Sequence, residues 1–128
     1  MKMRLWVLIA GFAVCLTAPP AAHHSCTADY DGGKPVTVKG VVSKVEWSNP
    51  HTHFYVDVKD DNGMVKTWKF EMASTLRLER GGWTRKTLPV GTAVTISGFG
   101  GRAVTERAIA SSITTAEGKS LFVGKPGQ

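Results

Sequence analysis

The sequence is poor in cysteine, and this excludes a fold held together by disulfide bonds. Only Cys15 and Cys26 occur among its 128 residues. Cys15 lies in an N-terminal segment that we expect to be removed, so the mature chain carries Cys26 alone and no intramolecular disulfide. We expect Cys26 to pack as a small hydrophobic residue, with an intermolecular cross-link or a soft metal ligand as the alternatives.

Several motifs that carry chemistry are also missing. The chain has no Cys-x-x-Cys, no glycine-rich phosphate loop before a helix and no Gly-x-Ser-x-Gly element. Its net charge of +6 falls to +4 when residues 1–22 are removed, and the basic residues are dispersed. We therefore expect a weakly cationic soluble surface rather than a nucleic-acid interface. A non-catalytic protein is favoured; copper redox chemistry is the activity to consider if it is an enzyme.

Residues 1–22 have the pattern of a cleavable signal peptide. Lys2 and Arg4 precede an apolar stretch, residues 5–16, that is too short to span a bilayer comfortably. Small residues and prolines follow, and they predict cleavage near Ala22. We expect a periplasmic protein with no membrane span after cleavage. The predicted organisation is a signal peptide (1–22), a flexible lead-in (23–34), a β-barrel domain (35–124) and a tail (125–128).

The first half of the mature chain alternates between apolar and polar residues, as β-strands do. Val36 and Val38 share one phase, which slips at Gly40, so we expect a β-bulge there with Val41, Val45 and Trp47 facing inward. From residue 52 the phase is regular, with Thr52, Phe54, Val56 and Val58 on the core side. Asn62-Gly63 then predicts a hairpin turn into a strand that carries Trp68, Phe70 and Met72 inward.

The second half predicts one short helix and three more strands. Ser74 is suited to cap a helix over residues 75–80, which Gly81 and Gly82 end. Strands are expected over residues 93–97, 108–115 and 121–123, with an excursion over residues 99–106. The whole pattern predicts a mainly β fold, a five- or six-stranded barrel of the oligonucleotide/oligosaccharide-binding (OB) type with one short helix. An open sandwich is the alternative.

All four histidines occur in two pairs, His23-His24 and His51-x-His53. Strand alternation places His51 and His53 on one face, roughly 6–7 Å apart and pointing away from the core. If cleavage makes His23 the first residue, its α-amino group and imidazole chelate Cu(II), because that amine loses its proton at a pKa of about 8. A further imidazole from His51 or His53 then completes the planar nitrogen set that copper(II) favours. The candidate metal ligands are therefore His23, His24, His51 and His53.

The same sequence supports a second hypothesis, an interaction module that binds a protein or glycan and no metal. Its candidate surface is the outer strand face with Tyr55 and Asp57, joined across the hairpin by Lys69 and Glu71. Trp83 follows a double glycine and is the one tryptophan that we expect to be exposed as a contact residue. The histidines are incidental in this hypothesis.

Several elements of the mature chain carry a family likeness: a His-His-Ser start at residues 23–25, Trp-x-Asn-Pro-His at residues 47–51, and residues 29–31, 34–40, 55–58, 80–85 and 88–91. In these elements the chain resembles an uncharacterised family of short exported bacterial proteins. The resemblance implies a periplasmic barrel-like domain and brings no established activity. Cys26 stands where the family usually has phenylalanine, and Thr52-His53 replaces an Ala-aromatic pair, which favours His51 over His53 as a site residue.

Overall fold

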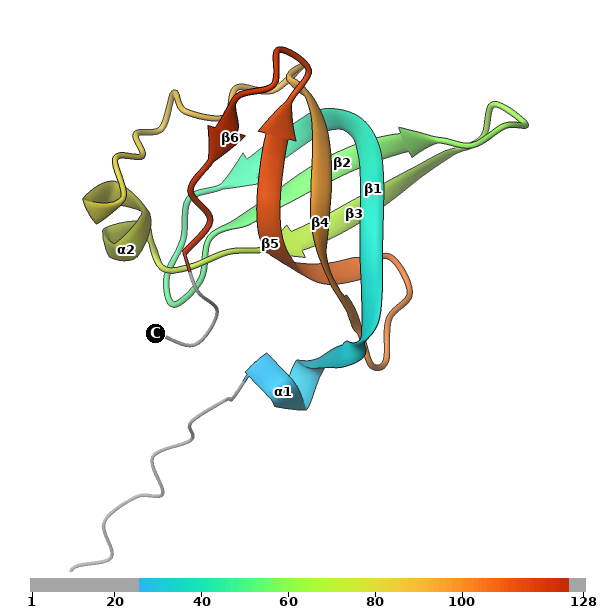
Figure 1. The fold of residues 1–128 in the computed structure, drawn as a ribbon, viewed down its shortest axis with the longest axis horizontal. Helices are drawn as coiled ribbons and strands as arrows, with labels where there is room; N and C mark the ends of the chain where they lie inside the picture. Colours follow the sequence, from blue (N-terminus) through green and yellow to red (C-terminus); the bar gives the residue numbers. More distant parts are fainter. Residues whose placement is uncertain (1–25, 125–128) are drawn as a thin grey trace, which may run out of the picture.

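A computed structural model describes residues 26–124 as a curled six-stranded sheet (Figure 1). The strand order is β3-β2-β1-β4-β5-β6, and a parallel pairing between β3 and β5 closes the sheet into a near-barrel. The predicted mainly β, OB-like fold is confirmed, whereas the signal peptide, His23, His24 and residues 125–128 lie outside the described residues. The elements are α1 (Cys26–Asp29), β1 (Tyr30–Glu46), β2 (His53–Lys59), β3 (Val65–Glu71), α2 (Thr75–Arg80), β4 (Ala93–Gly101), β5 (Arg107–Thr115) and β6 (Ser120–Leu121).

The β2–β3 hairpin follows the sequence prediction closely. Asp60 N donates to the carbonyl of Met64, and Gly63 adopts a φ of 81°, a conformation that glycine adopts without strain. Phe54 and Val56 are fully buried, so the predicted alternation along β2 is confirmed. The tip of the hairpin projects away from the barrel (Figure 1).

The prediction for β1 was wrong in its details. The strand begins at Tyr30, five residues before the predicted barrel boundary, and Val42 rather than Val41 is buried, at 1% against 45% exposure. The register shifts between Val42 and Lys44, so the irregularity falls after Gly40. Gly40 has another role, because a Cβ there would lie 2.3 Å from the carbonyl oxygen of Asp57 on β2. The glycine therefore permits a close approach of the two strands.

In the second half of the chain the predicted helix is confirmed, whereas the limits of the strands differ from the prediction. Ser74 accepts a hydrogen bond from Arg77 N and caps α2, as expected. Strand β4 continues to Gly101, into the segment predicted to be an excursion, and β6 is limited to Ser120 and Leu121. Within the described residues, no helix combines the length and apolar character that crossing a membrane requires.

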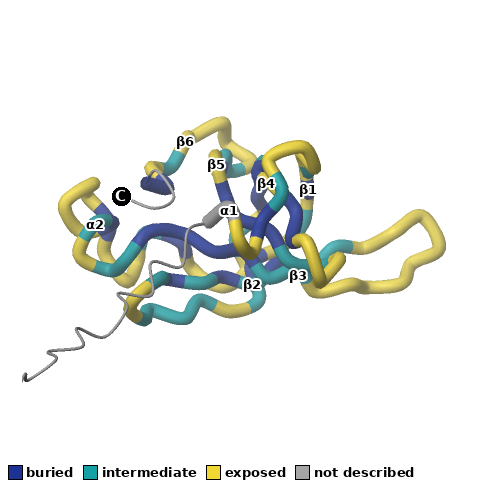
Figure 2. The backbone as a smooth tube through the Cα atoms, turned by 90° about the horizontal axis from the view of Figure 1, so that it is seen from below, coloured by how far each residue is buried: buried dark blue, intermediate teal, exposed yellow. Residues whose placement is uncertain are grey.

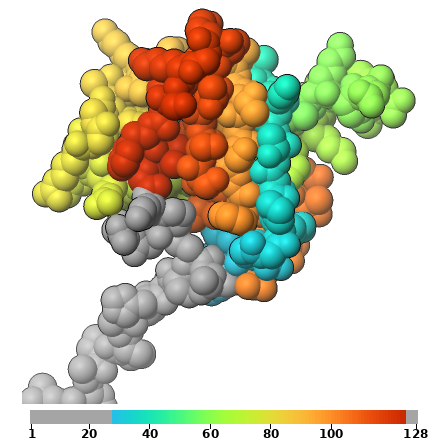
Figure 3. All heavy atoms as spheres, in the orientation of Figure 1, coloured from blue at the N-terminus to red at the C-terminus, as the bar shows by residue number. Residues whose placement is uncertain are grey.

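One core lies inside the curled sheet and extends beneath α2 (Figure 2). Trp83 belongs to this core at 4% exposure, so the expectation that it is an exposed contact residue was wrong. Its indole Nε1 donates to the carbonyl of Phe122, and its ring stacks on Trp47 at a centroid distance of 6.5 Å. The double glycine thus lets the chain turn Trp83 inward, and the segment after α2 lies beside the chain around β6 (Figure 3).

We predict that Gly40→Ala lowers the free energy of unfolding by about 1–3 kcal/mol, because the added methyl group collides with the backbone of β2. Gly32→Ala is the matched control, since a Cβ there meets nothing within 4 Å. Urea unfolding followed by tryptophan fluorescence measures both variants. Equal stability of the two variants would contradict the close approach at Gly40.

Candidate functional site

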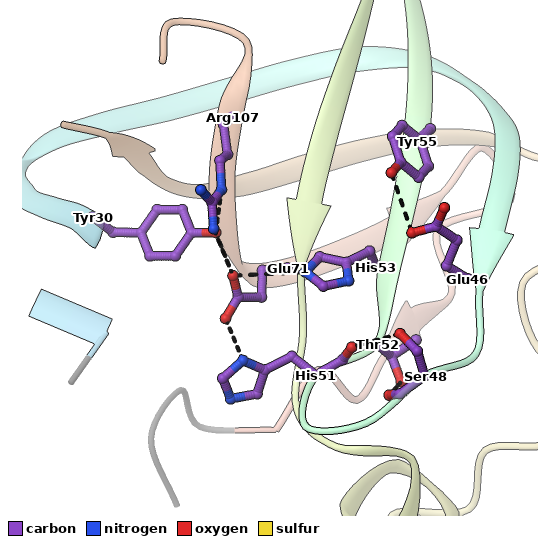
Figure 4. A network of polar contacts seen from close by, with 9 residues as sticks. All are labelled: Tyr30, Glu46, Ser48, His51, Thr52, His53, Tyr55, Glu71 and Arg107. Atoms are coloured by element: carbon purple, nitrogen blue, oxygen red, sulfur yellow. Dashed lines mark hydrogen bonds and ion pairs between the residues drawn. The ribbon is translucent and has the colours of Figure 1, made fainter. Parts of the chain in front are cut away.

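Four side chains surround the carboxylate of Glu71 at the end of β3 (Figure 4). His51 Nδ1 lies 2.6 Å from Oε1, and Tyr30 Oη donates to Oε2 at 2.5 Å. On the same oxygen, Arg107 Nη2 lies at 3.4 Å and His53 Nε2 at 3.8 Å. The side chain of Glu71 is only 7% exposed. We call these five residues the Glu71 cluster.

Strand pairing assembles the Glu71 cluster from three parts of the chain. The hairpin register places His53 opposite Glu71. The parallel pairing of β3 with β5 aligns Lys69 with Arg107 and brings the guanidinium to the same end. Tyr30 is the first residue of β1, and its ring lies under the guanidinium of Arg107 at 5.2 Å from Cζ. The site therefore exists only where the barrel closes.

The loop before β2 fixes the position of His51. Ser48 Oγ donates to the carbonyl of His51 at 2.9 Å, and the peptide bond after Asn49 is cis. Asn49 Oδ1 accepts two hydrogen bonds from Thr75, from its backbone N–H and its hydroxyl, which ties the loop to the start of α2. Thr52 is fully buried, and its backbone pairs with the two residues that follow β3. His51 is thus held from both sides.

The Glu71 cluster stabilises a buried negative charge. Burial raises the pKa of a carboxyl group, but at Glu71 the imidazole of His53 and the hydroxyl of Tyr30 outweigh it, together with the charges on His51 and His53. The pKa of Glu71 is consequently lowered to about 2. Burial and the hydrogen bond to Glu71 raise the pKa of Tyr30 well above its usual range. Glu71 is therefore ionised and Tyr30 neutral throughout the physiological range.

The contact with Glu71 orients the imidazole of His51 in a defined way. When the ring is neutral and its Nδ1–H donates to the carboxylate, Nε2 is left as the acceptor nitrogen on the far side of the ring. The side chain of His51 is 32% exposed, against 19% for His53, whose Nε2 faces the carboxylate. In the part of the chain that the structure describes, no group of three histidine, cysteine or acidic residues is arranged to hold a metal ion.

The predicted outer face is only partly available to a partner. Tyr55 lies between the ammonium groups of Lys44 and Lys69, 5.3 and 5.7 Å from the ring centroid, and donates to Glu46 at 3.2 Å. Asp57 accepts a hydrogen bond from Thr67. Glu71 had been assigned to this face, but it is 6% exposed because Tyr30 and Arg107 cover it. Trp83 is buried elsewhere.

Sequence reasoning missed the role of Glu71 and the participation of Tyr30 and Arg107. The register of the hairpin contains the signal for Glu71: once Asp60 is set opposite Met64, counting seven residues along each strand sets His53 opposite Glu71. Tyr30 and Arg107 lie 41 and 36 residues from Glu71, and no local pattern links them.

We predict that Glu71→Gln lowers the free energy of unfolding at pH 7 by about 2 kcal/mol, because the variant removes a buried charge that four side chains surround. The pKa of Glu71 is depressed, so its contribution is complete above its unfolded pKa of about 4.3 and is lost as pH falls towards 2. The stability difference between wild type and variant therefore shrinks between pH 5 and pH 2.5 in urea unfolding.

Glu106→Gln serves as the control for this experiment, since Glu106 forms a surface ion pair with Lys66 at 3.8 Å. We expect it to change stability little at any pH. A stability difference for Glu71→Gln that stays constant over the acid range would show that Glu71 is not a stabilising buried carboxylate.

No curated protein matches the sequence significantly. Among solved structures, the fold is similar to a mitochondrial single-stranded DNA-binding protein of S. cerevisiae, Rim1, with a TM-score of 0.52 and 6% identity over 65% of this chain and 93% of that one. This likeness concerns the fold. The model of a family described as a family of unknown function (DUF6152) matches residues 12–109, and the chain therefore belongs to this family.

Proposed function

We propose that this protein is a non-catalytic periplasmic binding protein that takes up copper(II) or a similar metal ion through His23, His24 and His51. The contact between His51 Nδ1 and Glu71 carries the proposal. Histidines that ligate metals commonly donate their other ring nitrogen to a carboxylate, which fixes the tautomer and makes the free nitrogen a better ligand. Nε2 of His51 is that nitrogen.

The start of the fold lies next to this imidazole. Tyr30 Oη donates to the same carboxylate that His51 contacts, and α1 immediately precedes Tyr30. His24 is only six residues before Tyr30 in the sequence. Residues 26–29 form α1, which rises only about 6 Å, so His24 is tethered at most about 17 Å from Tyr30 and within reach of His51. This proximity supports a site shared between the mature N-terminus and the loop before β2.

Export is part of the proposal. Cleavage after Ala22 in the periplasm frees the α-amino group of His23, and this amine with an imidazole offers copper(II) two nitrogens. His51 then supplies a third. Glu71 itself is occupied by Tyr30 and Arg107, so it orients the site as a positioning residue.

We predict that the secreted protein begins at His23 and binds one equivalent of Cu(II). His51→Ala then weakens binding at least about ten-fold, because losing a ligand costs no less than losing its carboxylate partner. Tyr55→Ala is the control, and we expect it to leave the affinity unchanged, because Tyr55 bonds Glu46 and lies outside the Glu71 cluster. Mass spectrometry gives the N-terminus, and titration against a competing chelator gives the affinity.

An additional alanine before His23 tests the N-terminal amine separately, because it keeps both imidazoles and moves only the α-amino group. We expect weaker Cu(II) binding by this variant. A mature chain that starts at Ala22 or earlier, or equal affinities for His51→Ala and wild type, would overturn the metal-binding proposal.

A second candidate is an interaction module that binds a protein or glycan on the outer face and no metal. The flanking of Tyr55 by Lys44 and Lys69 favours it, since an outward aromatic ring between two cations is a suitable contact surface. The strand 2–3 face is also where OB-type barrels bind oligosaccharides.

The two candidates differ in a measurable way. If the outer face binds a glycan, Tyr55→Ala abolishes binding to a defined glycan array, Tyr55→Phe keeps most of it because the ring remains, and His51→Ala or a chelator has no effect. Binding that depends on His51 and on Cu(II), and is indifferent to Tyr55, would exclude this second candidate.

A further inference from the structure

A polar cavity of about 290 Å³ lies between the segment after α2 and the chain around β6, seen as the yellow and red segments of Figure 3. None of its lining residues belongs to the Glu71 cluster. The lining combines two lysines and two hydroxyl residues with glycine backbone and hydrophobic side chains. The lysines are Lys86 and Lys119, the hydroxyl residues are Thr87 and Ser120, and Gly81 and Phe122 also line the cavity.

The charge in this cavity is positive and uncompensated. Lys86 and Lys119 both line it, and no carboxylate does. Neither ammonium group forms an ion pair with any of residues 26–124. Two like charges brought to one cavity repel each other, so an anion between them is stabilising.

Hydroxyl groups complete the donor set. Thr87 Oγ1 accepts a hydrogen bond from the backbone N–H of Thr84, which leaves its proton free to donate. Ser120 is a second hydroxyl residue that lines the same cavity. The residues that line the cavity thus include two lysines and two hydroxyl residues and no carboxylate.

The frame that carries these donors is well fixed. The ring of Phe122 packs directly on Gly81, where any Cβ would lie 2.2 Å from a ring carbon. Trp83 Nε1 donates to the carbonyl of Phe122, and Lys119 N donates to Thr115 Oγ1 at 3.3 Å. Glycine at position 81 therefore permits this packing, since any larger residue would make the ring of Phe122 shift.

We propose that this cavity is a binding site for a tetrahedral oxyanion, phosphate or sulfate. Lysine binds such groups as a compact point charge, and hydroxyl donors complement their oxygens. The volume is slightly below the range of about 300–1,000 Å³ typical of pockets for drug-sized ligands, which favours a small anion or a single terminal group.

Titration with inorganic phosphate, and separately with sulfate, tests the site by ¹H–¹⁵N NMR at constant ionic strength balanced with chloride. We expect saturable chemical-shift changes confined to residues 81–87 and 119–122, with a dissociation constant of about 1 mM. The double variant Lys86→Gln/Lys119→Gln should lose this saturation while its other resonances stay in place. Affinity should fall as salt is raised.

Lys39→Gln is the matched control. Lys39 lines a different cavity, of about 240 Å³, among Gly40, Val94 and mostly apolar neighbours. We expect this variant to bind phosphate as the wild type does. Two outcomes overturn the proposal: saturation by chloride at equal concentration, or unchanged phosphate binding by the double variant.

Gly81→Ala adds an independent test, since the added methyl group would displace Phe122 and open the cavity. We expect this variant to lose phosphate affinity at least about ten-fold, with a folded spectrum. Wild-type affinity in a folded Gly81→Ala protein would contradict the proposed cavity geometry.

Discussion

The buried carboxylate of Glu71 imposes the strongest constraint on this structure. A charge in a largely water-excluded position is tolerated only when donors surround it. Here the donors come from the start of β1, the loop before β2, β2 itself and the start of β5. Satisfying one carboxylate therefore requires the barrel to close, because no single hairpin carries all of these groups.

This constraint also explains the Trp-x-Asn-Pro-His motif in structural terms. Trp47 packs on Trp83, Asn49 accepts hydrogen bonds at the start of α2, and His51 contacts Glu71. These three side chains anchor the loop to different parts of the fold. A histidine presented by so constrained a loop loses little conformational entropy on binding a ligand, which is what preorganised sites require.

Local patterns in the sequence were sufficient to predict most of the fold. The turn at Asn62-Gly63, the alternation along β2 and the cap at Ser74 are each determined by neighbouring residues, and each was predicted correctly. The bulge after Val42 and the burial of Trp83 were not, because both depend on what a distant strand places beside them. For the same reason, strand alternation was enough to indicate His51 and His53 as candidate site residues. Tyr30 and Arg107 come near Glu71 only when the barrel closes, so no local pattern indicated them.

The contacts of the carboxylate argue that Glu71 orients the imidazole of His51 rather than binding a ligand itself. With Tyr30 and Arg107 on Oε2 and His51 on Oε1, the carboxylate has few lone pairs left for a ligand of its own. His51, in contrast, has a ring nitrogen that points away from every partner described for it. Because Tyr30 and His51 share the carboxylate, any movement of the lead-in that displaces Tyr30 also alters the hydrogen bonding of His51. The side chain of Glu71 thus couples the orientation of this imidazole to the closure of the fold and to the position of Tyr30 at the start of β1.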